Sequence, residues 1–302
     1  MTRSRVGSTA AGLALLAVAT VFIATEFGSS TSDEPLELSA HHPDGTPWSR
    51  GQLDASDRAD GTWRTWHPNG QIATEGDYSH GIEDGTWREY ATNGALLSER
   101  NYDAGTLKGP WLRSYPDGVP ESRGSFENGR RQGEWTDYHD TGEARSRGDF
   151  DVGRRVGLWR SWSPAGTLVA VQEFEDDRLQ GRTVRWTDEG ALLSIGEYDQ
   201  DRPSGQWWTF HPDGAVKDVA ARADDGRVRV TSFRTDGTAI TRGWLVEERQ
   251  SGPWVFWQPD GTVDLTLSGE YLDGTRTGPL TENADRALPL VPTPPSVAHY
   301  DE

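Results

Sequence analysis

A ten-residue frame recurs along this chain at a nearly constant interval. It reads GTWRTWHPNG at residues 61–70, and related frames begin at Gly85, Gly109, Gly133, Gly157, Gly181, Gly205, Val228 and Gly252. Successive starts are 24 residues apart, except for one step of 23 between Gly205 and Val228. A fixed period of about 20–50 residues is typical of repeat architectures, in which each unit packs against its neighbours. The nine frames therefore predict a stacked array rather than a compact globule.

Each repeat is predicted to be one β-hairpin. In the first unit the strand-like runs are TWRTWH and QIATEGDY, with Pro68-Asn69-Gly70 between them. Pro presets φ for a type I turn, Asn or Asp suits the next position, and Gly accepts the left-handed conformation that follows. The turn glycines predicted in this way are Gly70, Gly94, Gly118, Gly142, Gly166, Gly190, Gly214, Gly237 and Gly261. The predicted fold is all-β: an elongated single-layer antiparallel β-meander of about nine 24-residue hairpins.

Aromatic residues define the repeat and form a possible binding surface. They are Trp63, Trp66, Trp87, Tyr90, Trp111, Trp135, Tyr138, Trp159, Trp162, Trp186, Trp207, Phe210, Trp254 and Trp257. Alternate residues of a strand face the same side, so two aromatics three positions apart face opposite sides. We therefore expect an aromatic ladder on each face of one sheet. Arg64, Arg88 and Arg160 each follow a tryptophan, and we expect their guanidinium groups to cover neighbouring rings.

Composition supports a repeat array and excludes several classes of protein. Only 33% of residues are hydrophobic, yet there are 14 Trp and 35 Gly, which fits stacked rings better than a disordered chain or a large aliphatic core. The formal charge of −18 disfavours binding to nucleic-acid phosphates. The absence of cysteine excludes disulfides, thiolate metal sites, a cysteine nucleophile and a lipidated-cysteine anchor.

The two ends of the chain differ from the repeats. Arg3 and Arg5 precede an uncharged stretch, residues 10–25, so residues 1–27 are predicted to be a secretory signal peptide or an N-terminal membrane anchor. Both readings place the repeats outside the cytoplasm, secreted or anchored. Residues 28–40 are predicted to be a polar linker, residues 41–280 the repeat array, and residues 281–302 a Pro-rich disordered tail.

The pattern Gly-x-Trp-x-x-[Trp/Tyr]-x-x-x-Gly, followed by Gly-x-[Tyr/Phe]-x-x-Gly, resembles the MORN-repeat variant family of bacterial β-hairpin repeat proteins. The resemblance covers about residues 41–280. Tyr115 follows Trp111 by four positions instead of three, Thr183 replaces the tryptophan of its frame, and the unit at 228–251 is degenerate. The resemblance implies a hairpin array that binds proteins or membranes and implies no reaction. Bacterial members are often called antitoxins, a role that fits poorly with export.

No residue pattern points to catalysis, a metal or a cofactor. His67, His139 and His211 share one register position, but six strands separate neighbouring members, roughly 29 Å, so they cannot share an ion. Acidic pairs such as Asp176-Asp177 have no accompanying nucleophile or phosphate loop. The function expected from the sequence is an exported non-enzymatic scaffold for a protein partner at the cell envelope, with cell-wall or membrane association. The alternatives are a module that binds cell-wall glycan or a choline-like ligand in Trp/Tyr slots and, less favoured, an enzyme.

Overall fold

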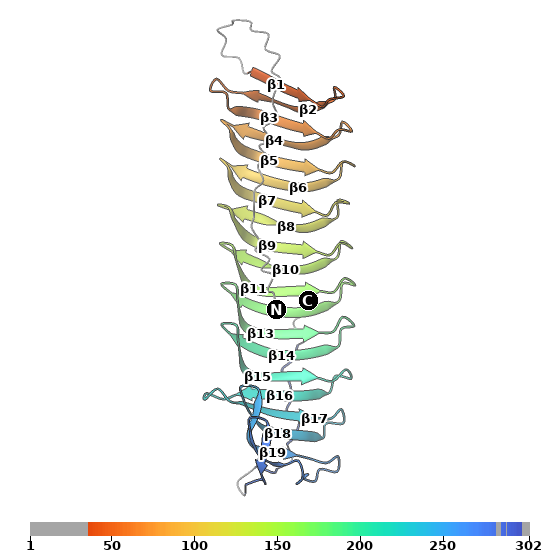
Figure 1. Cartoon of the computed structure of the whole chain (residues 1–302), viewed down its shortest axis with the longest axis vertical. Coiled ribbons are helices and arrows are strands. Elements are labelled where there is room, and N and C mark those ends of the chain that lie inside the picture. Colours follow the sequence, from red (N-terminus) through yellow and green to blue (C-terminus); the bar gives the residue numbers. More distant parts are fainter. Residues whose placement is uncertain (1–35, 282–284, 288, 298–302) are drawn as a thin grey trace.

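The computed structural model describes residues 36–281, 285–287 and 289–297. Every regular element within these residues is a strand, and together the strands form one 21-stranded sheet. Each strand pairs antiparallel with the strand before it and the strand after it, as β1 does with β2 and β2 with β3. Figure 1 shows the result as a single tall stack of hairpins. The predicted all-β, elongated, single-layer meander is confirmed.

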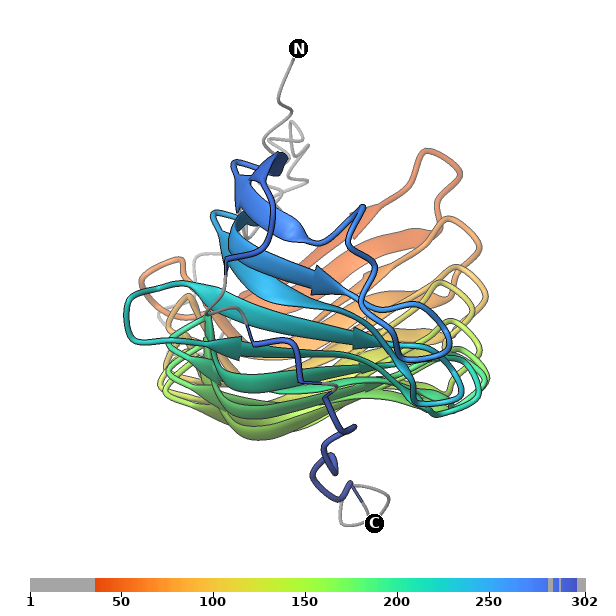
Figure 2. The same ribbon diagram turned by 90° about the horizontal axis from the view of Figure 1, so that it is seen from below.

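The strands are β1 (Leu36–His41), β2 (Pro47–Leu53), β3 (Ala59–Trp66), β4 (Ile72–Ser79), β5 (Ile82–Tyr90), β6 (Leu96–Asp103), β7 (Thr106–Ser114), β8 (Pro120–Glu127), β9 (Arg130–Tyr138), β10 (Ala144–Asp151), β11 (Arg154–Trp162), β12 (Leu168–Glu175), β13 (Arg178–Trp186), β14 (Leu192–Asp199), β15 (Arg202–Phe210), β16 (Val216–Arg222), β17 (Val228–Phe233), β18 (Ala239–Val246), β19 (Arg249–Phe256), β20 (Gly269–Leu272) and β21 (Thr275–Gly278). Twisting and bowing shape the stack. Seen along its long axis, the middle strands lie to one side of both ends (Figure 2).

Two kinds of turn alternate along the array. After β3, the Gly70 N–H donates to His67 O at 2.8 Å, and the His67 N–H donates to Gln71 O at 2.8 Å. The nine turn glycines named from the sequence all have φ between 80° and 91°, which glycine adopts without a Cβ clash. The other turn has two central residues, both at positive φ, as at His80 and Gly81. That geometry is a type I′ turn, whose twist matches the twist of paired strands.

The ends of the described chain differ from the sequence prediction in two places. Residues 36–40 were assigned to the polar linker but belong to β1, because Leu36 and Leu38 alternate with polar residues and the segment pairs with β2. At the other end, Val297 packs against a buried apolar cluster, so part of the tail predicted as disordered lies on the sheet. The proposed signal peptide or anchor, residues 1–27, lies outside the described residues. Among the residues that are described, the structure has no helix with the length and apolarity needed to cross a membrane.

The buried core is divided between the two faces of the sheet. We call the face that carries Trp63, Trp135 and Trp159 the ladder face; its buried cluster is Trp135, Phe150, Trp159 and Phe174. The other side is called the opposite face; its larger cluster is Val184, Ile195, Trp208, Phe210, Val216, Phe233, Ala239, Val255 and Trp257. A single layer thus buries side chains on both sides, as the predicted double set of aromatics requires.

Candidate functional site

On the ladder face, the first tryptophan of each frame alternates with the aromatic that ends the preceding hairpin. The ring centroids are 4.9 Å apart for Tyr78 and Trp87, and 5.3 Å apart for Phe126 and Trp135. The interplanar angles of 76° and 89° are edge-to-face, an arrangement that aromatic pairs favour. The pairs Phe150–Trp159 and Tyr198–Trp207 repeat this geometry. The rings of these units therefore form a ladder of edge-to-face pairs.

Every tryptophan of the ladder except Trp111 lies against a glycine of the neighbouring strand. A Cβ atom added at Gly76, Gly124, Gly148 or Gly196 would lie 2.1–2.4 Å from Cδ2 of Trp87, Trp135, Trp159 or Trp207, respectively. No side chain fits in that space. The Gly of each Gly-x-[Tyr/Phe] frame is thus the floor under the tryptophan of the next unit, a role that the sequence analysis did not assign. The sequence does carry a signal for this role, because the glycine of the Gly-x-[Tyr/Phe] frame and the first tryptophan of the next frame occur together along the chain.

Two units break the ladder in different ways. Thr183 replaces a tryptophan, and it pairs with Gln172, which replaces the floor glycine, so the two changes compensate. In the other unit Trp111 is retained but pairs with Arg100 instead of glycine. The Trp111 ring lies 5.2 Å from Trp135, at an interplanar angle of 36°. Without a glycine floor, Trp111 leans toward the next unit, and the ladder opens at this point.

The break beside Arg100 is accompanied by a hollow of about 650 Å³ on the ladder face. Two cations and two acids lie in its wall: Arg100 Nη2 is 3.3 Å from Glu89 Oε2, and Arg113 Nε is 2.8 Å from Glu121 Oε2. Arg100 Nε is buried and has no hydrogen-bond partner within the described part of the chain. Trp111 and Tyr115 supply ring surface, so the hollow combines aromatic faces with polar groups, as ligand pockets do.

Burial also affects the phenol beside this hollow. Loss of hydration raises the pKa of Tyr102, the nearby charge of Glu83 raises it further, and the charge of Arg100 opposes both. Tyr102 is therefore a neutral hydrogen-bonding group at neutral pH, since an unperturbed tyrosine already titrates near about 10. Its phenol cannot act as a general base there.

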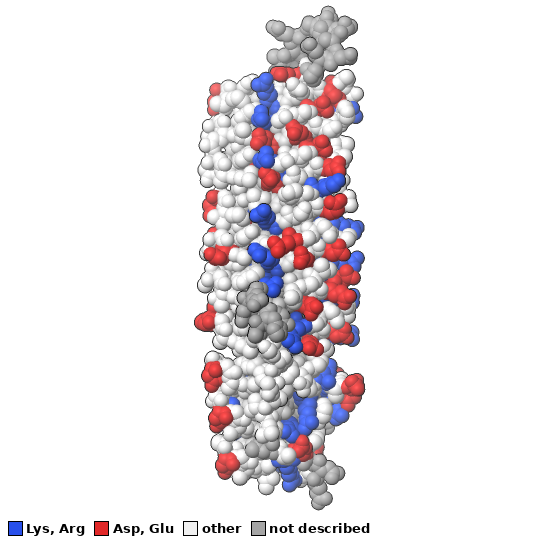
Figure 3. All heavy atoms as spheres, turned by 180° about the vertical axis from the view of Figure 1, so that it is seen from behind, with Lys and Arg blue, Asp and Glu red and all other residues white. Residues whose placement is uncertain are grey.

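A continuous central row runs down the opposite face. The strand register places one residue of each strand from β2 to β19 directly across from the next. In order they are Arg50, Arg64, Glu75, Arg88, Glu99, Leu112, Arg123, Thr136, Arg147, Arg160, Val171, Val184, Ile195, Trp208, Val219, Thr231, Arg242 and Val255. Figure 3 shows this face, with charged side chains following one another along its upper half.

The central row changes character along the array. From Arg64 to Glu99, bases and acids alternate, and Arg64 and Arg88 pair with Glu75 and Glu99 at 3.3 and 2.8 Å. In the middle, Arg123 and Arg147 form no ion pair with any residue that the structure describes. From Val171 to Val219 the row is apolar. One face thus presents an ion-paired, then a cationic, then an apolar segment.

The second aromatic of each frame lies beside the central row on the opposite face. Trp66, Tyr90, Tyr138, Trp162 and Trp186 are half-buried there, whereas Phe210 and Trp257 are buried. The expectation that Arg64 and Arg88 cover rings was wrong, because their guanidinium groups pair with carboxylates along the row. The arginines over the ladder are instead Arg131, 4.4 Å from the Trp135 centroid, and Arg155, 4.0 Å from that of Phe174.

The residue after this second aromatic ties neighbouring hairpins together. Nε2 of His67, His139 and His211 lies 2.9 Å from the carbonyl oxygen of Tyr90, Trp162 and Phe233, respectively. Tyr115 donates its hydroxyl to Tyr138 O at 2.9 Å from the equivalent position. Tyr115 therefore replaces the histidine, while Ser114 occupies the aromatic position. The described residues contain no group of three or more His, Cys, Asp or Glu side chains arranged to hold a metal ion.

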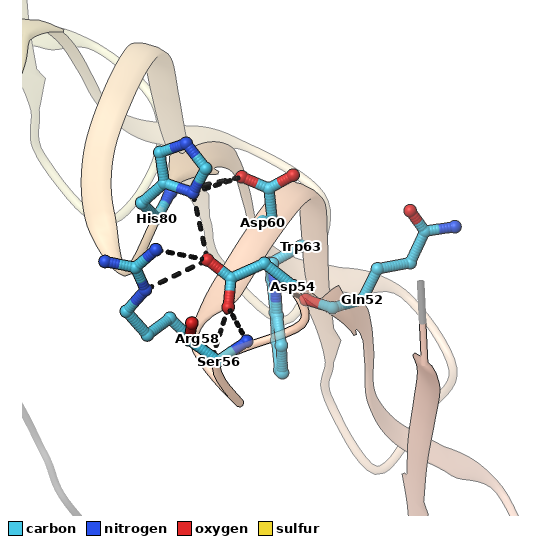
Figure 4. A network of polar contacts seen from close by, with 7 residues as sticks. All are labelled: Gln52, Asp54, Ser56, Arg58, Asp60, Trp63 and His80. Atoms are coloured by element: carbon cyan, nitrogen blue, oxygen red, sulfur yellow. Dashed lines mark hydrogen bonds and ion pairs between the residues drawn. The ribbon is translucent and has the colours of Figure 1, made fainter. Parts of the chain in front are cut away.

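A polar network joins the turns of the first hairpins (Figure 4). Asp54 accepts hydrogen bonds from Arg58 Nε at 2.9 Å, from Ser56 N at 2.8 Å and, across to the next hairpin, faces His80 Nδ1 at 2.9 Å. The hydrogen bonds from Arg58 and then His80 hold the pKa of Asp54 well below its usual range. The His80 N–H donates to Asp60 at 3.1 Å. These hydrogen bonds link the turn between β2 and β3 to the turn between β4 and β5. We therefore interpret the network as a clasp that holds neighbouring hairpins together, and not as a reactive centre.

Comparison with known proteins identifies the repeat. Residues 59–80 and 83–104 match the family model described as MORN repeat variant. These segments run from β3 to the turn after β6, and the same hairpin geometry continues through β19. No curated protein matches the sequence.

Several solved structures resemble the chain weakly. They include the Tc holotoxin pore of Photorhabdus luminescens, at 12% identity over 82% of this chain and 16% of that chain, with a TM-score of 0.21. They also include TcdB2-TccC3 without its hypervariable C-terminal region, at 11% identity over 84% of this chain and 15% of that chain, with a TM-score of 0.21. This chain thus spans less than a fifth of those chains. TM-scores this low support no argument about fold or function.

Proposed function

We propose that this chain, which carries MORN repeat variants, is an exported, non-enzymatic scaffold that binds a protein partner at the cell envelope. The repeat array and its β-hairpin fold are consistent with a scaffold. The observation that carries the proposal is the central row with its flanking aromatics on the opposite face. A row of this length offers a partner a long, open surface rather than an enclosed pocket.

The composition of that surface favours a protein as the partner. Trp, Tyr and Arg are the residues most enriched in protein interfaces and in their energetic hot spots. On strands β3 to β9, Trp66, Tyr90 and Tyr138 remain half-buried beside the central row. The same stretch of the row contains Arg123. Rings that are only half covered lose further apolar area when a partner docks. The first half of the opposite face is therefore the proposed partner surface.

The envelope location rests on the sequence. Arg3 and Arg5 precede the uncharged stretch at residues 10–25, the arrangement of a signal peptide or an N-terminal anchor. Fusion of residues 1–40 to a reporter that is active only outside the cytoplasm tests this part. An inactive reporter, with a control signal peptide active in parallel, would contradict export.

A partner search with matched charge reversals tests the interface. The full chain, tagged at the C-terminus, is crosslinked in its host, and captured envelope proteins are identified. We expect Arg123→Glu, on the proposed surface, to lose the partner. Arg178→Glu, at the start of β13 where the side chain bonds Gln200, should retain it. A partner that is captured equally by both variants, or only from cytosolic extracts, would contradict the proposal.

The hollow beside Trp111 favours a second candidate function, the binding of a cell-wall glycan. Aromatic faces and paired acids and bases suit a sugar ring, which offers both C–H faces and hydroxyl groups. The two carboxylates in the wall, Glu89 and Glu121, are already paired with Arg100 and Arg113, so neither is free to neutralise a quaternary ammonium group, and a choline-like ligand fits this hollow less well. Of the two ligand classes expected from the sequence, the geometry therefore favours the glycan.

Cosedimentation with cell-wall sacculi separates the two candidates. If the glycan function holds, the chain pellets with sacculi, and Trp111→Ala and Arg113→Ala abolish pelleting, whereas Arg123→Glu does not. Tryptophan fluorescence, read on addition of soluble muropeptides, should change in the unmodified chain and not in the Trp111 variant. Pelleting that none of these substitutions alters would exclude the hollow as the glycan site.

A further inference from the structure

The C-terminal tail is attached to the opposite face at two points near the end of the array. Asp285 Oδ2 lies 2.6 Å from Arg242 Nη1 on β18 and 3.2 Å from Arg229 Nη2 on β17. Val291 lies against the turn between β17 and β18, because its Cγ2 atom is 3.5 Å from the position of a Cβ built at Gly237. The tail is therefore seated on strands that come shortly before it in the chain.

Between these two attachments and the sheet lies a groove. Pro289, Leu290 and Pro292 form one wall of a hollow of about 320 Å³. The other wall consists of side chains on β15, β16 and β17, which we call the tail groove: Gln206, Val219, Ala221, Thr231 and Phe233. Grooves lined by apolar and aromatic groups are the surfaces on which proline-rich peptides dock. Since the hollow persists beneath the tail and Leu290 is 91% exposed, the tail covers this groove without filling it.

The basic end of the tail groove requires an acid. The Arg242 side chain is only 14% exposed, and Asp285 supplies the one carboxylate among the described residues that lies within ion-pair distance of it. Burial lowers the pKa of the Arg242 guanidinium, and the charge of Asp285 opposes this effect. A largely buried cation without a counter-ion is unfavourable, so an occupant of the groove must place a carboxylate at this point.

The attachment of the tail is open to exchange. Asp285 and Arg229 are 54% and 44% exposed, and ion pairs between exposed side chains contribute little to stability, because water and salt screen them. Four prolines lie between residues 289 and 295, and each fixes its own φ angle, so a segment of this kind loses little conformational freedom when it docks. A second segment with the same chemistry can therefore compete for the groove.

We propose that the tail groove is a recognition site for a peptide segment with an acidic residue followed by a proline-rich apolar stretch, and that the chain's own tail, residues 285–287 and 289–297, occupies it as an intramolecular competitor. The partner is then a protein segment of this chemistry, which gains access when the tail leaves. The groove lies on β15 to β18, whereas the partner surface proposed above lies on β3 to β9. The inference thus goes beyond the proposed function and does not rest on it.

A labelled peptide tests the recognition. The probe is DRALPLVPTPPSV, residues 285–297, acetylated at its N-terminus and carrying a dye at its C-terminus, and fluorescence anisotropy reports its binding. The full chain with Asp285→Arg should bind the probe at least about tenfold more tightly than the unmodified chain, because the tethered tail no longer competes. Asp188→Arg, in the turn after β13, is the matched control and should bind the probe as the unmodified chain does. The Asp285→Asn form of the probe should bind the Asp285→Arg chain at least about tenfold less tightly than the original probe.

A reversible disulfide tests the competition within one molecule. The chain has no cysteine, so Gly237→Cys and Val291→Cys together introduce a single pair, at positions that the structure places in contact. We expect the oxidised chain to exclude the probe even when Asp285→Arg is added, and reductant to restore binding. The oxidised and reduced samples are the same protein, so the strain of a side chain at Gly237, where φ is 80°, affects both equally.

Several results would overturn the proposal. One is a probe that binds the unmodified, Asp188→Arg and Asp285→Arg chains equally, or binds none of them; Asp285→Ala, which removes the ion pair without adding a charge, is the second variant and should act in the same direction as Asp285→Arg. Another is equal binding to the oxidised and reduced disulfide variant. A tail-dependent dimer of the unmodified chain would assign the occupant to a second copy and would overturn it as well.

These measurements use neither Arg123 nor the envelope partner. A failed partner search with the expected pattern of probe binding would therefore remove the proposed function alone. Loss of that pattern, with a partner still captured through Arg123, would remove the inference about the tail groove alone.

Discussion

At the scale of single residues, the type I′ turns are unevenly strained. Asn128 and Val152 occupy the same turn position in successive units, at φ of 50° and 47°. Asparagine tolerates left-handed backbone because its short polar side chain bonds locally, whereas a β-branched residue there is an outlier. Val152 is also half-exposed, so burial does not compensate for its strain.

We therefore expect Val152→Asn to stabilise the protein. The gain should be about 1 kcal/mol in the free energy of unfolding, the strain that a left-handed conformation costs an ordinary residue. The reciprocal change Asn128→Val, one unit away, should destabilise by a similar amount. Urea unfolding of both variants is the measurement, and the same sign for both would show that turn strain does not set their stability.

The clasp at Asp54 predicts a pH dependence of stability. Its folded pKa lies below the ordinary value of 3.8, first because Arg58 donates to the carboxylate. A carboxyl group with a lowered pKa adds stability above its unfolded pKa and loses it as the pH falls toward the folded pKa. Asp54→Asn should therefore lower the unfolding midpoint at pH 7, and the deficit should shrink as the pH falls below about 3.8.

The same substitution in an Arg58→Ala background serves as the control for the clasp. With the main donor removed, the folded pKa of Asp54 returns toward its ordinary value, and Asp54→Asn should cost less at pH 7. Thermal melts across the acid range are sufficient to measure this. If Asp54→Asn lowers the unfolding midpoint by the same amount at every pH, with or without Arg58, then the asparagine acts through the turn backbone and not through the lost charge.

At the scale of the hairpin, the tryptophan and its glycine floor are one structural unit. Where Thr183 replaces tryptophan, Gln172 fills the floor, and Thr183 is 2% exposed. We expect Thr183→Trp alone to destabilise by about 1–3 kcal/mol, because the ring would overlap Gln172. The double variant Gln172→Gly/Thr183→Trp should recover this loss and gain about 0.5–1.5 kcal/mol per edge-to-face contact with Phe174 and Tyr198.

A complete double-mutant cycle measures this coupling. Gln172→Gly alone should destabilise, since it leaves a gap beside Thr183 and adds backbone freedom. The two substitutions must then be strongly non-additive, as expected for residues in contact. Additive effects in urea unfolding would show that the floor and the ring are independent.

These elements also show what the sequence could and could not predict. The 24-residue period and the Pro-Asn-Gly type of turn were sufficient for the hairpins, the single layer and the place of the turn glycines. Register is harder to predict, because most neighbouring strands are offset by a bulge, such as the shift between Thr65 and Trp66. A bulge of one residue decides which side chains meet, so neither the glycine floors nor the central row followed from spacing alone.

The hollow beside Trp111 shows the same limit. The sequence marked this unit as irregular because Tyr115 stands four residues after Trp111. The physical cause lies on the neighbouring strand, where Arg100 takes the place of the floor glycine. Only the register brings Arg100 and Trp111 together. The tail could not be predicted either, since its Pro-rich composition indicates disorder and its fit to the opposite face depends on the Arg229–Arg242–Asp285 ion pairs.

At the scale of the whole molecule, stability should spread along the array through neighbouring units. A ring on a single-layer sheet has no second layer to cover it, yet Trp135 is only 1% exposed. It contacts Trp111, Phe126 and Phe150, with Arg131 over its ring. The neighbouring units supply this cover, so a single layer buries its middle rings as fully as a compact core does.

Trp135→Ala should accordingly cost about 3–5 kcal/mol, the range for removing a buried tryptophan. Trp254, on β19 near the end of the array, is 4% exposed but has fewer ring neighbours, Phe256 and Tyr271. Trp254→Ala should cost at least about 1 kcal/mol less, because fewer ring contacts are lost. In addition, only the short strands β20 and β21 follow β19, so the unit of Trp254 has less structure to stabilise on that side. Urea unfolding of both variants of the full chain is the measurement. Equal or reversed costs would mean that the tryptophans are not a coupled ladder, and the ladder-face rings would then be better explained as ligand slots.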